Sequence, residues 1–238
     1  MGLQQLIHHY SSSSRGRIPI AVLKSLIFQL LNGVHYLHCQ HVLHRDLKPA
    51  NVLVDTAGRV KIGDLGLARV VRNPLATLYS GDRVVVTIWY RAPELILGAR
   101  HYGRPIDVWA IGCVLAELAG LRPLFKGEEA KVDPKRGAPF QRDQMAKIVD
   151  VLGSVNESEW PGVRDMPDYA AMKKMDTVSQ SRLGEWCAQK GLKTRDGGPQ
   201  PAYEILKAML TYDPAKRVTA ESALTHDWFK QEPTPTAK

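Results

Sequence analysis

The sequence has little of what marks secreted or membrane-spanning proteins. Its 238 residues include only three cysteines, Cys39, Cys113 and Cys187, and this odd number at wide spacing argues against a disulfide framework. The longest apolar segment, Val108 to Leu121, contains Glu117 and is too short to span a bilayer. No charged segment followed by an apolar core opens the chain, so we expect no secretory signal. The sequence therefore predicts a soluble protein of a reducing intracellular compartment, without a membrane partner.

Positive charge is in excess, and the excess is concentrated in one part of the chain. The formal net charge is +8, and residues 59–104 carry eight Lys or Arg against three Asp or Glu. This stretch is either a solvated basic face or a surface that attracts anionic ligands and acidic partners. No aromatic interleaving and no nucleic-acid-binding motif accompany the charge, which disfavours direct binding of nucleic acid.

Two short segments collect side chains that can do chemistry. The first is His44-Arg45-Asp46-Leu47-Lys48-Pro49-Ala50-Asn51, and Asp64-Leu65-Gly66 begins thirteen positions after its end. Between them, apolar runs at residues 52–54 and 60–62 flank a turn at residues 55–58, a pattern typical of a β-hairpin. Pairing of the two runs would bring the two chemical segments to the same end of a β-ribbon.

Three oxygen-bearing side chains, Asp46, Asn51 and Asp64, would then converge with Lys48 between them. Magnesium prefers such hard oxygen ligands, and phosphoryl transfer also needs a group that orients the attacking hydroxyl and a cation for the phosphate. Taken singly, Asp46 could cap a helix, Asn51 could belong to a turn, and Asp64 could be an ordinary loop carboxylate. Their order and spacing together favour the catalytic interpretation.

Helical periodicity is clear in several segments. From Pro19 to about Gln40, apolar residues recur at three- and four-residue steps, which predicts a helix leading into the first chemical segment. Residues 106–118 are apolar nearly all round, as in a helix at the centre of a core, and Asp107 lies in its first turn. Shorter helices are predicted at residues 144–152, 203–210 and 219–228.

Other segments lack such periodicity. Ser11 to Ser14 predicts a flexible loop, residues 67–81 a long loop, and residues 126–141 an exposed insertion. Residues 153–201 carry a weak signal. His35, with histidines at 38, 41 and 44 and Cys39 among them, could suggest a zinc site, but the helix ends before the four imidazoles can share one face.

The two chemical segments resemble the catalytic loop and the metal-binding motif of protein kinases. Residues 64–94, which end in Ala92-Pro93-Glu94, resemble a kinase activation segment. The resemblance covers nearly the whole chain and implies an α+β, protein-kinase-like fold for residues 1–238. In particular it implies a mainly α-helical C-terminal lobe with a short β-ribbon at the catalytic loop (residues 44–51). Neither Gly-x-Gly-x-x-Gly nor Val-Ala-Ile-Lys occurs in the sequence, so we expect the N-terminal β-lobe to be absent.

The resemblance implies ATP and Mg²⁺ as ligands and assigns a role to each residue of the motif. Asp46 would be the catalytic base, and Lys48 would stabilise the transferring phosphoryl group of the nucleotide. Asn51 and Asp64 would hold magnesium against the nucleotide phosphates. Leu65 replaces the commoner Phe, and we expect it to fill the same apolar slot.

The resemblance also implies structural roles for three charged residues. Asp107 would brace the backbone of the catalytic loop. Arg217, in Asp213-Pro214-Ala215-Lys216-Arg217, would pair with Glu94.

The stretch Trp89-Tyr90-Arg91-Ala92-Pro93-Glu94 resembles the group of cyclin-dependent and mitogen-activated kinases. Residues 84–102, 122–131 and 139–145 are similar to the Mediator-complex cyclin-dependent kinases of fungi. This likeness implies a nuclear serine/threonine kinase that phosphorylates Ser-Pro or Thr-Pro sites, such as those of the RNA polymerase II C-terminal tail. It implies a C-type cyclin and other Mediator kinase-module subunits as partners. The alternative is a catalytically inactive, truncated lobe that acts as a binding module.

One position of the activation segment departs from most cyclin-dependent kinases. They carry a phosphorylated threonine five positions before the residue that matches Thr87, and here Asp82 occupies that place. A permanent carboxylate could pair with Arg45 and Arg69, with Arg91 in the same basic segment, and partly replace the phosphate. We therefore expect activation without phosphorylation of the activation segment.

Overall fold

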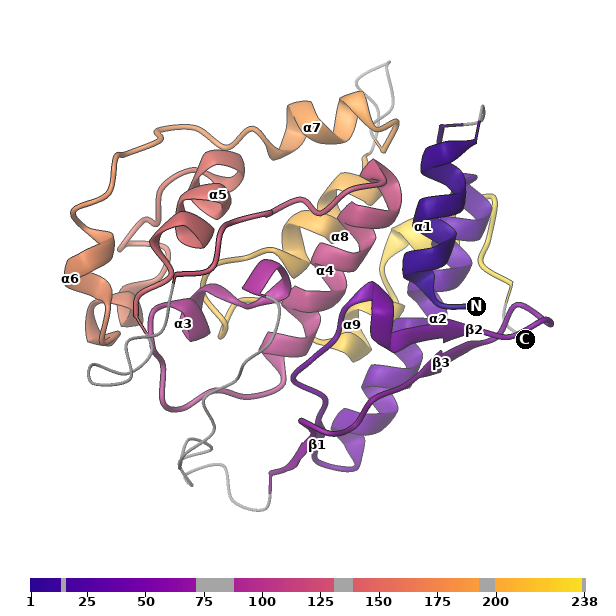
Figure 1. The fold of residues 1–238 in the computed structure, drawn as a ribbon, viewed down its shortest axis with the longest axis horizontal. Coiled ribbons are helices and arrows are strands. Elements are labelled where there is room, and N and C mark those ends of the chain that lie inside the picture. The colour runs from indigo at the N-terminus through magenta and orange to yellow at the C-terminus, as the bar shows by residue number, and fades with distance from the viewer. Residues whose placement is uncertain (14–15, 72–87, 131–138, 193–199, 237–238) are drawn as a thin grey trace.

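The computed structural model describes residues 1–13, 16–71, 88–130, 139–192 and 200–236 (Figure 1). Helix α4 (Pro105–Gly120) runs through the middle of the molecule, with α2 (Ile20–Cys39) packed on one side and α8 (Pro201–Met209) on another. Helix α9 (Ala220–Leu224) also lies against α2. Helices that converge on one apolar helix make a single hydrophobic core.

Helix α2 follows the predicted periodicity from Pro19 to Gln40. Its inward face is buried, whereas Val22 at its start is 38% exposed. By length and composition alone α2 could also cross a membrane. Here it packs on α4 and α9, as a core helix does. The prediction of this helix is confirmed.

Helix α4 is buried on nearly every face, from Ile106 to Leu118. Trp109 stacks on Phe125 with ring centroids 5.8 Å apart. The helix ends where Leu121 adopts a left-handed conformation, with φ of 57°. A helix without a polar stripe requires neighbours all round, which α2, α8 and the 3-10 helix η2 (Ile88–Tyr90) provide.

Two antiparallel β-ribbons are the only named sheets in the described part of the chain. Strand β2 (Val52–Val54) pairs with β3 (Val60–Ile62), with Val52 opposite Ile62. This is the predicted hairpin, which is therefore confirmed. Strand β1 (Val42–Leu43) pairs with β4 (Arg69–Val70) in a second ribbon that the sequence did not reveal. Strands of two residues are too short to show alternation.

The remaining helices are short and surround this core. They are α1 (Leu3–Ser12), η1 (Pro49–Asn51), α3 (Pro93–Ile96), α5 (Arg142–Leu152), η3 (Pro161–Asp165), α6 (Tyr169–Met172), α7 (Leu183–Gln189) and α10 (Asp227–Lys230). Several of them lie in residues 153–201, where turns of four to seven residues give no measurable periodicity.

One prediction about a loop needs correction, and another stays open. Ser11 and Ser12 belong to α1, and both hydroxyls donate to the carbonyl of His8, a bond that lets serine remain in a helix. The segment expected to be an exposed insertion, residues 126–141, is anchored at both ends, but residues 131–138 lie outside the described residues, so this expectation stays a prediction. Gln141 is buried and accepts a hydrogen bond from the Ala130 amide, and Gly127 is buried against Gln144.

Candidate active site

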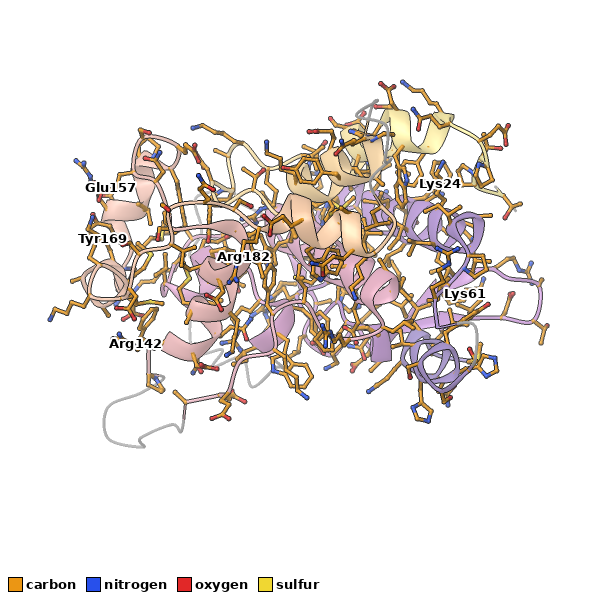
Figure 2. All side chains as sticks on the ribbon, turned by 90° about the horizontal axis from the view of Figure 1, so that it is seen from above. Lys24, Lys61, Arg142, Glu157, Tyr169 and Arg182 are labelled. Atoms are coloured by element: carbon orange, nitrogen blue, oxygen red, sulfur yellow. The ribbon has the colours of Figure 1, made fainter. Side chains whose placement is uncertain are left out.

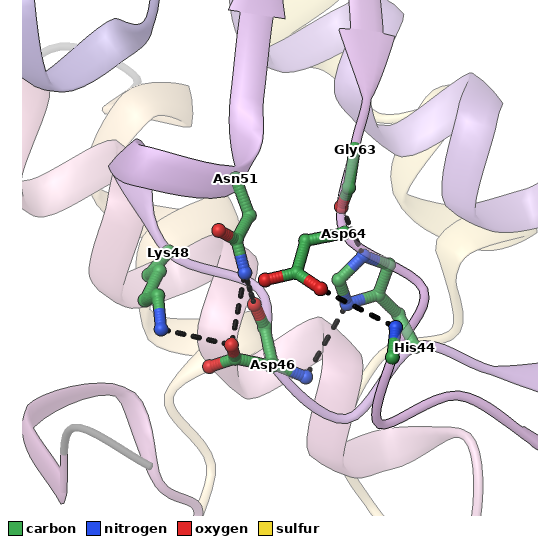
Figure 3. Close-up of polar contacts among 7 residues, drawn as sticks. His44, Asp46, Lys48, Asn51, Gly63 and Asp64 are labelled. Carbon is green, nitrogen blue, oxygen red and sulfur yellow. Dashed lines mark hydrogen bonds and ion pairs between the residues drawn. The ribbon is translucent and has the colours of Figure 1, made fainter.

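The β2–β3 hairpin brings the two chemical segments together. Beyond the last strand pair, the amide of Gly63 donates to the carbonyl of Asn51 at 2.8 Å. Asn51 and Asp64 are therefore at the same end of the ribbon, and Asp46 lies on the loop before it (Figure 3). The turn at the other end is closed by Asp55, whose carboxylate accepts from the amides of Ala57 and Arg59.

Asp46 is the centre of this arrangement, and only 6% of it is exposed. Its Oδ2 accepts from Lys48 Nζ at 2.8 Å and from Asn51 Nδ2 at 2.9 Å. Its Oδ1 is buried and has no hydrogen-bond partner within the described residues. A buried carboxylate oxygen without a partner is costly, and a substrate hydroxyl would relieve that cost.

Asn51 and Asp64 offer oxygen atoms suited to magnesium. The Asn51 amide nitrogen donates to both the backbone carbonyl and the carboxylate of Asp46, at 2.8 and 2.9 Å, which leaves the amide oxygen for a cation. Asp64 is exposed, has φ of 57°, and among the described residues accepts a hydrogen bond only from Gly66 N, at 3.3 Å. One amide and one carboxylate oxygen are a donor set that Mg²⁺ accepts when phosphates and waters complete its shell.

Asp107, which is 1% exposed, binds the backbone of the loop that carries Asp46. Asp107 accepts from the backbone amides of His44 and Arg45 at 2.9 and 2.8 Å, and it lies 3.0 Å from His38 Nε2. His44 is fully buried, with Nε2 at 2.9 Å from the Gly63 carbonyl and Nδ1 accepting the Asp46 amide. These two contacts fix one neutral tautomer of His44.

Glu94 and Arg217 lie in contact, both almost fully buried. Arg217 Nη1 and Nη2 donate to the two carboxylate oxygens at 2.7 and 2.9 Å. The other three N–H groups of Arg217 donate to the carbonyls of Thr211, Tyr212 and Pro105. All five guanidinium donors are thus used, which joins α3, the start of α4 and the segment before α9.

Of the residues expected to act around the activation segment, the structure describes three. Arg45 has φ of 72°, and its guanidinium lies 5.6 Å from the centre of the Tyr102 ring. Arg69 is paired with Leu43, two residues before Arg45. Arg91 follows η2 directly. Asp82 and Thr87 lie outside the described residues, so the expected pairing of Asp82 with arginines stays a prediction.

The segment before Ala92 is fixed by hydrogen bonds from Trp89 and Tyr90 that the sequence did not reveal. The Tyr90 hydroxyl donates to Glu117 Oε2 at 2.6 Å, and Trp89 Nε1 donates to the Gly127 carbonyl at 2.8 Å. Burial raises the pKa of Glu117, and the bond from Tyr90 opposes that rise. The available signal was Glu117, a second carboxylate far from the first turn of an apolar helix, because such a group needs a donor.

Two further expectations find no support here. Leu65 is 54% exposed, so described residues do not provide the apolar slot expected for it. His38 is engaged with Asp107, and no cluster of three or more His, Cys, Asp or Glu side chains in the described ranges could hold a metal ion. The zinc alternative is therefore not supported there.

Comparison with known proteins accords with this geometry. The model of the protein kinase domain matches residues 1–229. The chain belongs to the protein kinase family. This confirms the family expected from residues 44–51 and 64–66, and it supports the kinase fold.

Two curated relatives that match this chain are protein kinases of the same kind. The chain is 55% identical to a serine/threonine-protein kinase SSN3 from Mycosarcoma maydis over 99% of its length, and 54% identical to one from Yarrowia lipolytica over 97%. A chain of the crystal structure of the yeast RNA Pol II CTD kinase CTDK-1 complex superposes with a TM-score of 0.82, at 32% identity over 99% of this chain and 70% of that one.

The chain spans only part of the curated relatives that it matches, 33% of the first and 56% of the second. The activity, substrates and partners of a whole kinase are therefore matters of proposal. The expected absence of an N-terminal β-lobe also stays a prediction.

Proposed function

We propose that this chain provides the catalytic lobe of a Mediator-associated, cyclin-dependent serine/threonine kinase. It transfers the γ-phosphoryl group of ATP to Ser-Pro or Thr-Pro sites, such as those of the RNA polymerase II C-terminal tail, in the nucleus. Its partners are a C-type cyclin and other Mediator kinase-module subunits. The likeness to SSN3 kinases supports the assignment.

One observation carries this proposal: Asp46 is buried, and described residues engage only one of its carboxylate oxygens. Lys48 and Asn51 hold Oδ2, so the plane of the carboxylate is fixed while Oδ1 has no partner in the described part of the chain. A substrate hydroxyl that donates to Oδ1 would be oriented for attack on a phosphorus atom. A helix cap or a turn residue would not require this arrangement.

The other residues of the site divide the charge of the reaction between them. Asn51 and Asp64 would hold Mg²⁺, which neutralises charge on the nucleotide phosphates when bound. Lys48, 2.8 Å from Asp46, would stabilise the phosphoryl group as it moves toward the hydroxyl. His44 and Asp107 keep the loop in place, so little reorganisation is needed during the reaction.

The alternative function is that of a binding module without turnover. Its basis is that residues 1–238 by themselves contain no Gly-rich loop and no strand lysine to close over the nucleotide. For the polypeptide of residues 1–238 alone, we predict very weak ATP binding and very weak phosphotransfer. Robust activity of this polypeptide that is abolished by Asp46→Asn would contradict that prediction.

The proposed function is tested in a completed kinase, in which this chain is joined to the upstream residues of the Yarrowia lipolytica relative and co-expressed with a C-type cyclin. We expect phosphorylation of tail peptides that contain Ser-Pro, and a large loss when Pro is replaced by Ala. Equal rates on both peptides would overturn the specificity. Absence of turnover, with the cyclin bound, would favour the binding module.

Activation without phosphorylation of the activation segment is part of the proposal. Asp82→Asn in the completed kinase should lower kcat, because an amide cannot replace the charge of a phosphate. A requirement that an upstream kinase modify Thr77 or Ser80 before any activity appears would contradict it.

A further inference from the structure

The end of the described chain lies across α2. We call residues 231–236 the C-terminal strap. Thr236 donates its amide to Ser25 Oγ at 3.0 Å, and the two hydroxyls are also 3.0 Å apart. In Figure 1 the strap (yellow) runs beside α2 toward the turn of the β2–β3 hairpin. A hydrogen bond between α2 and the hairpin turn supports this placement of the strap. Gln29, one helical turn after Ser25, donates to the carbonyl of Gly58 in that turn.

A buried lysine explains why the strap lies there. Lys24 is only 2% exposed, and burial lowers its pKa. Its ammonium donates to the Gln231 carbonyl at 2.7 Å and lies 5.9 Å from the centre of the Trp228 ring. Figure 2 shows Lys24 where α2 meets the last helix. Without the strap, this ammonium would lose its carbonyl acceptor.

The strap also carries an exposed Thr-Pro pair. Thr234-Pro235 is the only place in the 238 residues where Ser or Thr precedes Pro. Thr234 is exposed and lies in no helix or strand. The proline that follows disfavours a helical backbone at Thr234.

We propose that Thr234 is a phosphate-acceptor site for proline-directed kinases, and that phosphate there releases the C-terminal strap from α2. That another copy of this kinase performs the step rests on the proposed function. In that step the bond between the γ-phosphorus and the bridging oxygen of ATP breaks, and a bond from Thr234 Oγ1 to phosphorus forms. The hydroxyl proton passes to Asp46 of the other copy, and ADP leaves.

The donor must be a separate molecule. The strap reaches the part of α2 that contacts the hairpin turn, whereas Asp46 and Asn51 lie at the opposite end of the same hairpin. The reaction between two copies is therefore second order in protein concentration.

The local charge explains the release. The Thr234 amide donates to the Glu232 carboxylate at 3.2 Å, so a phosphate on Thr234 adds its negative charge beside a carboxylate. Lys24 offsets only part of this repulsion: attraction to Glu232 raises its pKa against the larger lowering by burial, but its ammonium is buried and already donates to the Gln231 carbonyl. Repulsion between the phosphate and Glu232 breaks the hydrogen bond of the Thr234 amide to Glu232 and shifts the backbone at Thr234. Thr236, two residues further on, then loses its hydrogen bonds to Ser25.

The experiment uses the polypeptide of residues 1–238 as substrate for a separately purified cyclin-dependent kinase of known Ser/Thr-Pro preference. Mass spectrometry should place phosphate on Thr234, and Pro235→Ala should abolish it, while Thr236→Val should leave it unchanged. Hydrogen exchange of the Thr236 amide should become about tenfold faster after phosphorylation. Glu232→Gln should reduce this acceleration.

The outcomes separate the two proposals. Phosphate on a peptide of residues 229–238 but none on the intact chain would overturn the acceptor site, as would exchange at Thr236 that is unchanged or slower. Modification by the added kinase without modification by the completed kinase leaves the acceptor site supported and counts against the proposed function of this chain.

Discussion

The molecule contains two groups of polar and charged residues that differ in how completely their hydrogen bonds are made. The reaction edge consists of Asp46, Lys48, Asn51 and Asp64, and the helical base consists of Glu94, Asp107 and Arg217. The carboxylate and guanidinium groups of the base are buried and fully used, with five donors engaged on Arg217 alone. At the edge, Asp46 Oδ1 has no partner among the described residues, and Asp64 is exposed.

The difference shows how stability and chemistry are divided. Charges with complete hydrogen bonding hold helices and loop in one arrangement, and their loss leaves buried groups unpaired. Side-chain oxygens that lack a protein hydrogen-bond partner among the described residues can bind substrate or metal. Substitutions in the base should therefore reduce stability first, and substitutions at the edge should reduce activity with little effect on stability.

The largest expected loss of stability follows from Arg217→Ala. It removes the partner of buried Glu94, and we expect the free energy of unfolding to fall by about 3–5 kcal/mol. Chemical denaturation followed by circular dichroism measures it. The matched control is Arg164→Ala, which breaks the exposed pair with Glu157 and should not shift the denaturation midpoint measurably. Equal shifts of the denaturation midpoint for the two variants would contradict the claim that the buried ion pair stabilises the fold more than an exposed one.

Asp107→Asn should lower both the free energy of unfolding and kcat, each by an intermediate amount. The amide cannot accept both backbone N–H groups of His44 and Arg45, so we expect a loss of about 1–3 kcal/mol in unfolding free energy. Because the same bonds fix the loop that carries Asp46, kcat of the completed kinase should also fall. A variant with reduced stability but unchanged kcat would show that the base does not position the edge.

At the edge, Asp64→Asn should change metal use rather than stability. The completed kinase should need more Mg²⁺ for half-maximal activity, since one anionic ligand is lost. The free energy of unfolding should change by less than about 0.5 kcal/mol, because Asp64 is exposed. Asp176→Asn, at an exposed carboxylate outside the site, serves as control for both measurements. An unchanged magnesium requirement would count against Asp64 as a ligand.

The smallest effect concerns pH and Glu117. Burial raises the pKa of this carboxyl above its ordinary value of 4.5, so the folded state binds the proton more tightly than the unfolded state. The contribution of Glu117 to stability is therefore present at low pH and falls as pH rises through the raised pKa. Relative to the wild type, Glu117→Gln should gain in Tm as the pH rises above 4.5, the ordinary pKa of this carboxyl. A difference in Tm that is independent of pH would contradict this.

The sequence contained enough to predict the reaction edge and the long helices. The order and spacing of Asp46, Asn51 and Asp64 carry the motif, and the hairpin between them has a clear turn at residues 55–58. Helix α2 has twenty residues, long enough for its apolar positions to reveal a period.

Other features depend on contacts between distant residues, which spacing does not contain. The β1–β4 ribbon joins residues 42 and 70, and Tyr90 meets Glu117 across the core. Serines 11 and 12 looked like loop residues, yet their bonds to His8 allow them to extend α1. Local composition was a weak guide where a single hydrogen bond decides the conformation.

The central claim is that Asp46 acts in the reaction and does not hold the fold. The most direct measurement is kcat together with the free energy of unfolding for Asp46→Asn in the completed kinase. We predict a fall in kcat of about 10²–10⁴, with the free energy of unfolding changed by less than about 1 kcal/mol. Wild-type turnover, or a loss of activity that is matched by unfolding, would contradict the claim.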